Sequence, residues 1–409
     1  MTISKWLTIL VTVLAAIGTA TAGTETTLYD FKGFDDGSDP QNYGHLVRDA
    51  SGNLFGTTQF GGSCDQGTVF EVLPNGTGGW NETVLHAFCG GTDGSNPLSS
   101  VILDTSGNIY GTTSGAGNGT CGTVFKLSGT ILTTLHTFTC LSDGGNPISG
   151  LIHVNNGSFF GTASGGDTGW GVVYEISRTG TFTVLYNFCQ LSGCADGANP
   201  MGGLVRDSIG NLYGTTFNGG DMGCIFSTPG CGVVFELSKV GGVWTETVLH
   251  TFSGKKNDGA NPIFASLTLV NQKINNRKAL VIYGVTNAGG RDSGGTVFQM
   301  VRGSKRFSFK ILHNYGCCEA EGLQPVGTLA FSKGHLFGTT IQGGAGESGT
   351  VFELSEKDNV WSENILYTFV NGEDGGHPYS GVVIDPSGTL YGTASSDGGI
   401  AGDVYQVVP

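Results

Sequence analysis

Six aspartates recur in one short context and could act together as carboxylate ligands or as acid–base groups. Each precedes Gly in a segment that ends in Pro, as in DGSNP or DGANP, and a seventh copy is degenerate at EAEGLQP. The six are Asp36, Asp93, Asp143, Asp196, Asp258 and Asp374. If they converge they could bind Ca²⁺, which prefers oxygen ligands, or a substrate. The other interpretation, which we favour, is that each Asp caps a turn through its neighbouring backbone.

Four histidines occupy equivalent positions and could be ligands or bases. They are His86, His136, His250 and His313, and the same position holds Tyr29, Tyr186 and Tyr367 in other units. A position that accepts His and Tyr alike is typical of a packing site with a polar tip. We therefore predict a structural role for this set, and likewise for the three matching tryptophans Trp80, Trp244 and Trp361.

Basic residues gather in one unit of an otherwise acidic chain of net charge −14. The insertion 270–280 and the loop 301–307 carry Lys273, Arg277, Lys278, Arg302, Lys305 and Arg306. One hypothesis is a docking patch for an anionic polymer or partner; the other is a pair of solvated loops. The low charged fraction, 13%, argues against a nucleic-acid backbone as partner.

Ten cysteines predict disulfides if the chain is exported. In each of two units, one cysteine precedes the third apolar run and another follows the fourth run. This arrangement predicts Cys64 with Cys89 and Cys121 with Cys140. Two local loops predict Cys189 with Cys194 and Cys224 with Cys231. The pairing of Cys317 and Cys318 stays open. A zinc site is the competing hypothesis, but no C-x-x-C spacing supports it.

These residues are positioned by a repeat. Pentads such as LFGTT and LYGTT recur seven times, and their glycines are spaced by 55, 50, 53, 70, 54 and 54 residues. Each unit holds four short runs rich in Val, Thr, Phe and Tyr, bounded by Gly, Asn, Asp or Pro, which is typical of strands. Four antiparallel strands per unit predict an all-β fold, a seven-bladed β-propeller over residues 23–409. We expect the pentad to be an inner strand whose Gly makes room for a neighbouring ring.

The two ends of the chain complement each other. The seventh unit stops after its third run, and the missing run, TLYDF at residues 27–31, lies near the amino terminus. A first strand that completes the last blade closes the ring and covers two strand edges. An open solenoid is the alternative architecture, but it would need distinct capping repeats.

The pattern GNLYGTT followed by GTVFEL resembles the GloVer-type tandem repeat of secreted bacterial proteins. The resemblance covers nearly the whole chain after residue 22. It implies export and a repeat fold, and it brings no established reaction or catalytic residues. Relatives often carry a C-terminal sorting anchor, which this chain does not show, so we expect release from the cell.

Residues 1–22 have the layout of a secretory signal, with Lys5, an apolar run of about 13 residues and a small-residue end at Ala22. That run is too short to span a bilayer. We expect a secreted, extracellular or periplasmic monomer without a firmly implied cofactor. The leading hypothesis is a module that binds extracellular glycan or protein without catalysis. The alternative is a polysaccharide hydrolase or lyase with its site at an Asp-bearing channel mouth.

Overall fold

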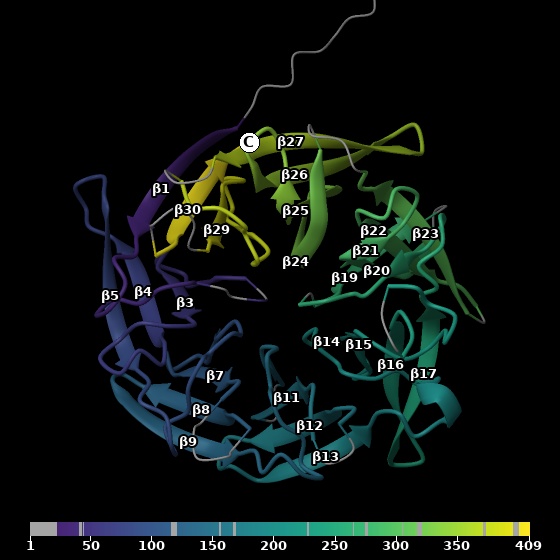
Figure 1. Ribbon diagram of the computed structural model, residues 1–409, viewed down its shortest axis with the longest axis horizontal. Coiled ribbons are helices and arrows are strands. Elements are labelled where there is room, and N and C mark those ends of the chain that lie inside the picture. Colours follow the sequence, from purple (N-terminus) through teal and green to yellow (C-terminus); the bar gives the residue numbers. More distant parts are fainter. Residues whose placement is uncertain are drawn as a thin grey trace, which may run out of the picture.

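The chain forms a closed ring of seven four-stranded antiparallel sheets around a central axis (Figure 1). The computed structural model describes residues 23–40, 43, 45–115, 121–154, 157–166, 169–226, 229–264, 266–274, 277–304, 306–316, 321–370, 374–395 and 401–409. The predicted signal segment, Lys305, Cys317 and Cys318 lie outside the described residues. The predicted all-β, seven-bladed propeller is confirmed.

Blades 1 to 6 run from the innermost to the outermost strand in chain order, whereas the outermost strand of blade 7 is the first strand of the chain. Blade 1 consists of β2 (Val47–Arg48), β3 (Leu54–Thr58), β4 (Thr68–Pro74) and β5 (Trp80–Ala87). Blade 2 consists of β6 (Ile102–Leu103), β7 (Ile109–Thr113), β8 (Thr123–Ser128) and β9 (Ile131–Thr137). Blade 3 consists of β10 (Ile152–His153), β11 (Ser158–Ala163), β12 (Val172–Ser177) and β13 (Phe182–Asn187). Blades 4 and 5 consist of β14 (Val205–Arg206), β15 (Leu212–Thr216), β16 (Val233–Val240) and β17 (Val243–Thr251); β19 (Thr268–Ile274), β20 (Arg277–Thr286), β22 (Thr296–Arg302) and β23 (Phe307–Asn314). Blade 6 consists of β24 (Gly322–Ser332), β25 (His335–Gly343), β26 (Glu347–Lys357) and β27 (Val360–Val370). Blade 7 consists of β28 (Val383–Ile384), β29 (Leu390–Ala394), β30 (Asp403–Val408) and β1 (Thr24–Asp30). A pair β18 (Gly259–Ala260) and β21 (Ala288–Gly289) and one 3-10 turn, η1 (Ser192–Cys194), complete the described elements.

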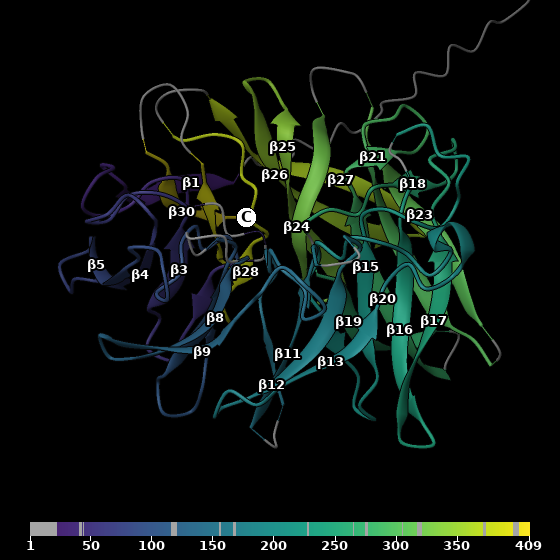
Figure 2. The same ribbon diagram turned by 60° about the horizontal axis from the view of Figure 1, so that its bottom comes forward.

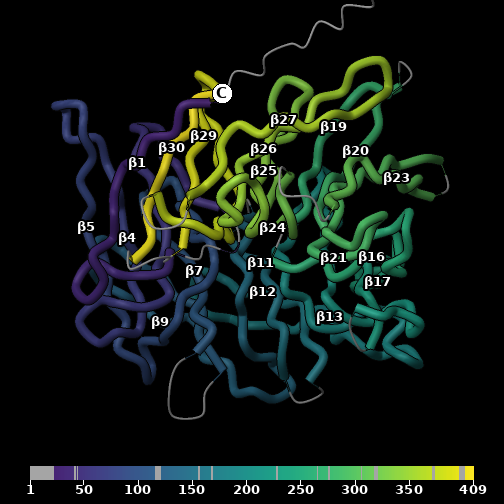
Figure 3. Tube along the Cα trace, turned by 45° about the horizontal axis from the view of Figure 1, so that its top comes forward, coloured from purple at the N-terminus to yellow at the C-terminus, as the bar shows by residue number. Residues whose placement is uncertain are grey.

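The first strand closes the ring. β1 pairs antiparallel with β30, from Thr24 opposite Val408 to Asp30 opposite Asp403, and Figure 3 shows the two segments side by side. Phe31, just after β1, is 2% exposed and packs edge-on against Phe70 of blade 1 at 5.0 Å. The blade formed from both ends of the chain is therefore also sealed onto its neighbour.

The repeated pentad is the second strand of each blade. Its aromatic is buried in all seven copies, from Phe55 to Tyr391. Its Gly lies opposite an aromatic of the third strand, as Gly214 does opposite Phe235. A Cβ on Gly214 would lie 2.6 Å from Cζ of Phe235, so only Gly leaves room for that ring. The role predicted for the pentad is confirmed.

The predicted tryptophan packing is also confirmed. Each Trp of an outermost strand meets the pentad aromatic of the preceding blade edge-on. The pairs are Trp80 with Tyr391, Trp244 with Phe160 and Trp361 with Tyr283, at centroid distances of 6.3, 6.0 and 6.3 Å. These rings fill the space between sheets.

The loops that link blades and the loops before the third strands emerge on the same face. Short bridges join them in five blades, for example Ser95 with Gly115 and Ala198 with Asn218. The hairpins between the third and fourth strands emerge on the other face, as the β16–β17 hairpin does in Figure 2. The two loop sets therefore share a face.

Four disulfides in the described part of the chain tie these loops. They join Cys64 to Cys89, Cys121 to Cys140, Cys189 to Cys194 and Cys224 to Cys231. These are the pairs that the sequence predicts, and such bonds are typical of an oxidising compartment. No helix in the described part of the chain is long and apolar enough to cross a membrane.

We predict that Phe31→Ala weakens ring closure. Loss of a buried aromatic leaves a cavity between blades 7 and 1 and should lower the free energy of unfolding by about 3 to 5 kcal/mol. Urea unfolding followed by tryptophan fluorescence measures this change. Phe34→Ala is the control, because Phe34 is 86% exposed; equal effects of the two substitutions would contradict the closure model.

Candidate functional site

The six recurring aspartates bind their own blades at the circumference of the ring. Each accepts a hydrogen bond from the His or Tyr of the outermost strand that precedes it. The pairs are Tyr29–Asp36 (2.7 Å), His86–Asp93 (3.0 Å), His136–Asp143 (3.1 Å), Tyr186–Asp196 (2.8 Å), His250–Asp258 (2.9 Å) and Tyr367–Asp374. The outermost strands form the rim of the ring in Figure 1. The enzyme hypothesis requires these aspartates to surround the mouth of the axial channel. They lie at the circumference of the ring instead.

Each of these aspartates also caps the backbone of its link. The amide N–H of Cys89 donates to Asp93 at 2.8 Å, and that of Gln190 donates to Asp196 at 2.9 Å. The contacts are those of the turn-capping interpretation. In the degenerate sixth link Glu321 occupies the Asp position and interacts electrostatically with His313. Gly322 pairs with Gly343 there, as Gly259 pairs with Gly289 in the fifth link.

The His or Tyr position also contacts the next blade. His136 stacks on Phe182 at 3.9 Å and His250 stacks on Phe309 at 3.8 Å. Four junctions have Glu at this neighbouring position instead. At one of them Glu363 lies 3.8 Å from His313, and at the other three the Glu interacts electrostatically with the Asp that caps the Tyr. The three pairs are Glu82 with Asp36, Glu246 with Asp196 and Glu25 with Asp374.

Burial, reinforced by these aspartates, raises the pKa of all three glutamates. The pKa rises to about 7 for Glu25 and Glu82 and to about 8 for Glu246. Paired carboxyl groups with separated pKa values also occur in acid–base catalysis. Here, however, the pair recurs at three blade junctions and each Asp already holds a Tyr hydroxyl, which indicates a structural role. The described residues contain no group of three or more His, Cys, Asp or Glu arranged to hold a metal ion.

The sequence pattern alone missed a polar network at the other end of the blades. The Asp of the first hairpin caps its turn, and the Asn after that turn donates to a Glu of the third strand: Asn53 to Glu71 at 2.8 Å and Asn211 to Glu236 at 2.7 Å. In blade 4 the hydroxyl of Tyr213 also donates to Glu236, at 2.9 Å. The repeated Asn before the pentad was the available signal.

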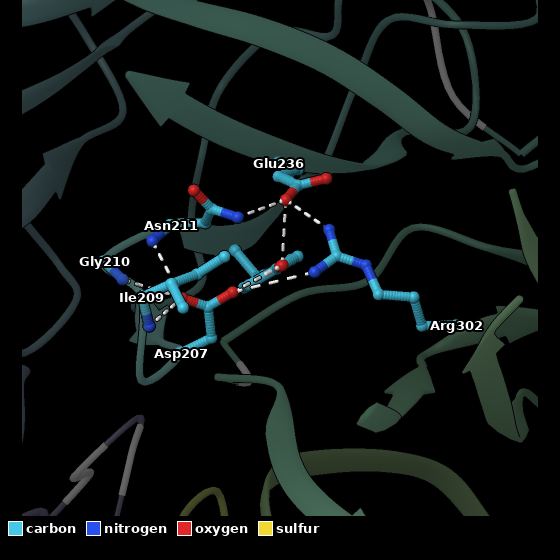
Figure 4. A network of polar contacts seen from close by, with 7 residues as sticks. Asp207, Ile209, Gly210, Asn211, Glu236 and Arg302 are labelled. Atoms are coloured by element: carbon cyan, nitrogen blue, oxygen red, sulfur yellow. Dashed lines mark hydrogen bonds and ion pairs between the residues drawn. The ribbon is translucent and has the colours of Figure 1, made fainter. Parts of the chain in front are cut away.

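Arg302 of blade 5 enters the blade 4 network (Figure 4), where it forms the only ion pairs of an Arg or Lys among the described residues. Its Nη2 lies 2.6 Å from Oε1 of Glu236, and its Nη1 lies 3.8 Å from Oδ2 of Asp207. The guanidinium also lies over the rings of Tyr213 and Phe307, 5.9 and 5.2 Å from their centroids. Its charge is therefore largely compensated, and its side chain bridges two blades.

Two cavities flank Arg302, and both are lined by Arg302, Gly303 and Ser304. The first, of about 350 Å³, is lined in addition by Glu236, Thr247, Val248, Leu249, Arg306 and Phe307. The second, of about 570 Å³, is lined in addition by Ile274, Arg277, Lys278, Ala279 and Val301. The two hairpins of blade 5 thus bring together four of the six predicted basic residues. Lys273 lies opposite Lys278 in the β19–β20 pairing and lines neither cavity.

A third cavity, of about 420 Å³, lies between blades 6 and 7 and contains a His–Glu pair that sequence reasoning did not single out. Nδ1 of His335 lies 2.6 Å from Oε1 of Glu353, and Lys333 and Ser387 line the same cavity. His335 occupies the position of Asn53 and Asn211 in the repeat, and Glu353 that of Glu71 and Glu236. The pair is therefore one more copy of the hairpin network.

We predict that Glu246→Gln stabilises the protein in alkaline solution. The folded-state pKa of Glu246, about 8, lies above the ordinary value of 4.5, so the native state holds a proton that the unfolded state has lost between these values. Stability from this group is complete below pH 4.5 and is lost as the pH rises through 8. Gln stays neutral at both pH values. The free energy of unfolding of the variant should therefore exceed that of the parent by about 1 kcal/mol at pH 8.5 and by little at pH 5.

Urea unfolding at both pH values measures this difference. Glu356→Gln is the matched control, because Glu356 is exposed in blade 6. If the free energy of unfolding at pH 8.5 rises no more in Glu246→Gln than in Glu356→Gln, the raised pKa assigned to Glu246 is refuted.

The chain is similar to several solved structures. Hydrazine synthase of Kuenenia stuttgartiensis aligns at 13% identity over 90% of this chain and 96% of that chain, with a TM-score of 0.51. A luciferin-regenerating enzyme aligns at 14% identity over 76% and 90%, with a TM-score of 0.43. Trypanosoma rangeli sialidase aligns at 10% identity over 84% and 58%, with a TM-score of 0.40. At these identities the likeness concerns the fold alone.

No curated protein sequence matches the chain. The model of the Gloeobacter/Verrucomicrobia repeat matches residues 16–226 and 192–406, which together cover nearly the whole chain. With its seven repeat-built blades, the chain belongs to the Gloeobacter/Verrucomicrobia repeat family.

Proposed function

We propose that the protein is a secreted module that binds an extracellular glycan or protein and has no catalysis of its own. The observation that carries this proposal is the pair of cavities on the hairpins of blade 5, at the place where the repeat is interrupted. Their lining combines cationic, apolar and hydroxyl side chains. A surface of this kind can hold a ligand through charge, hydrogen bonds and apolar contact together.

The carboxylates near these cavities favour binding over hydrolysis. A glycosidase generally needs two carboxyl groups on either side of the bond that it breaks. The two cavities contain one carboxylate, Glu236, and its Oε1 already accepts hydrogen bonds from Asn211, Tyr213 and Arg302. The aspartates of the links lie against the outermost strands and are occupied by capping.

A second candidate function is a polysaccharide hydrolase or lyase, supported by the pair His335–Glu353 in its cavity of about 420 Å³. A His held by a Glu can act as a general base. The equivalence of this pair with Asn53–Glu71 and Asn211–Glu236 weakens the candidate, because a side chain that completes a repeated network is explained by the fold. The four disulfides fit the secreted location of either candidate.

Incubation of the mature protein with a panel of immobilised polysaccharides tests both candidates. We expect retention on at least one polysaccharide with no increase in reducing ends or in unsaturated products. Release of new chain ends that disappears in Glu353→Gln would replace the module by the enzyme. As a control, Glu71→Gln alters the same network in blade 1, away from the third cavity.

A further inference from the structure

We propose that the two cavities beside Arg302 bind an anionic polysaccharide, one that carries carboxylate or sulfate groups along its chain. This inference rests on the proposed binding function and names the ligand of that same site. It concerns Arg277 and Lys278 above all, because their charges remain available for a ligand.

The larger cavity is lined by cations and by no acidic side chain. Arg277, Lys278 and Arg302 are its charged residues. Arg302 is compensated by Glu236 and Asp207. In contrast, no carboxylate of the described residues forms an ion pair with Arg277 or Lys278. Both residues are exposed at the start of β20. On a protein of net charge −14, two such cations side by side form a local attraction for an anion.

The uncharged lining suits a sugar chain. Ile274, Ala279 and Val301 offer apolar surface in the larger cavity, and Phe307 offers an aromatic ring in the smaller one. Thr247 and Ser304 supply hydroxyl groups that can exchange hydrogen bonds with sugar hydroxyls. The hydrophobic faces of sugar rings can pack on the apolar side chains, while hydrogen bonds to the two hydroxyl groups fix the orientation of the rings.

The shared wall indicates an extended ligand. Both cavities contain Gly303 and Ser304, so they meet at the tip of the β22–β23 hairpin. Arg302 stands between them, fixed by blade 4 and by Phe307. A polymer that crosses this tip can place an anionic group at Arg277 and Lys278 and a neighbouring sugar against Phe307. Nucleic acid is a poorer fit, because a continuous phosphate chain needs a longer row of Lys and Arg than this weakly charged chain offers.

Affinity electrophoresis in gels that contain polygalacturonate, dextran sulfate or uncharged dextran tests the proposal. We expect retardation by at least one anionic polymer and none by dextran, with weaker retardation at higher salt. The double variant Arg277→Gln with Lys278→Gln should lose about ten-fold in affinity, as expected for two partly exposed charge contacts. The carboxylated and sulfated polymers distinguish the two anionic groups.

Lys255→Gln with Lys256→Gln is the matched control. It removes the same charge from an exposed pair in the link between blades 4 and 5, on the face opposite to the hairpins. An equal loss of affinity for the anionic polymer in both double variants would overturn the proposed site. Equal binding of dextran would overturn the anionic ligand while the binding function stands. Binding of a protein ligand with no polysaccharide retained would overturn the glycan, and no binding of any kind would overturn the proposed function itself.

Thr247→Phe tests the smaller cavity without a change of charge. The added ring should obstruct the space beside Phe307 and weaken binding of long chains more than binding of short oligogalacturonates, which need only the larger cavity. Unchanged affinity for long chains would show that the ligand does not extend into the smaller cavity and would refute that part of the proposal.

Discussion

The pairing of β1 with β30 is the constraint on which the rest of the structure depends. Each sheet buries both faces against its neighbours, so an open ring would expose two apolar faces and two strand edges. Closure through the two ends of the chain removes both problems and completes the seventh blade. Phe31 then fills the seam between the composite blade and blade 1. The two faces of the ring, and the loops that each presents, follow from this closure.

Repetition inside one chain separates architecture from candidate function. The pentad Gly with its facing ring, the His or Tyr with its Asp, and the Asn with its Glu recur around the ring, and each solves a local packing or capping problem. Arg48 of blade 1 also reaches the preceding blade, over Tyr391, but among the described Arg and Lys side chains Arg302 alone forms ion pairs with carboxylates of another blade. The hairpins of blade 5 are therefore the part of the surface that the fold does not explain, and two cavities lie there.

Charge is distributed unevenly over the molecule. At three blade junctions a half-buried Glu lies near the Asp of the adjacent blade, and burial favours its neutral form. Such junctions become less favourable when the glutamates ionise, which couples the packing of the ring to pH. The free cations are on a different surface, at the start of β20. An acidic body with a small basic region can select an anionic ligand at that region while repelling it elsewhere.

The sequence by itself determined the strands, the seven blades, the closure and the four disulfides, because these follow from local patterns and from their period. Strand direction alone places Cys64 beside Cys89, for instance. Only the tertiary structure decided which side chains meet across blades. Asp36 and Glu82, or Arg302 and Glu236, belong to different repeats, and their contact depends on how one twisted sheet is offset against the next. Spacing along the chain does not encode that offset. It was therefore the packing of neighbouring sheets that brought Arg302 to Glu236 and left Arg277 and Lys278 without a partner carboxylate.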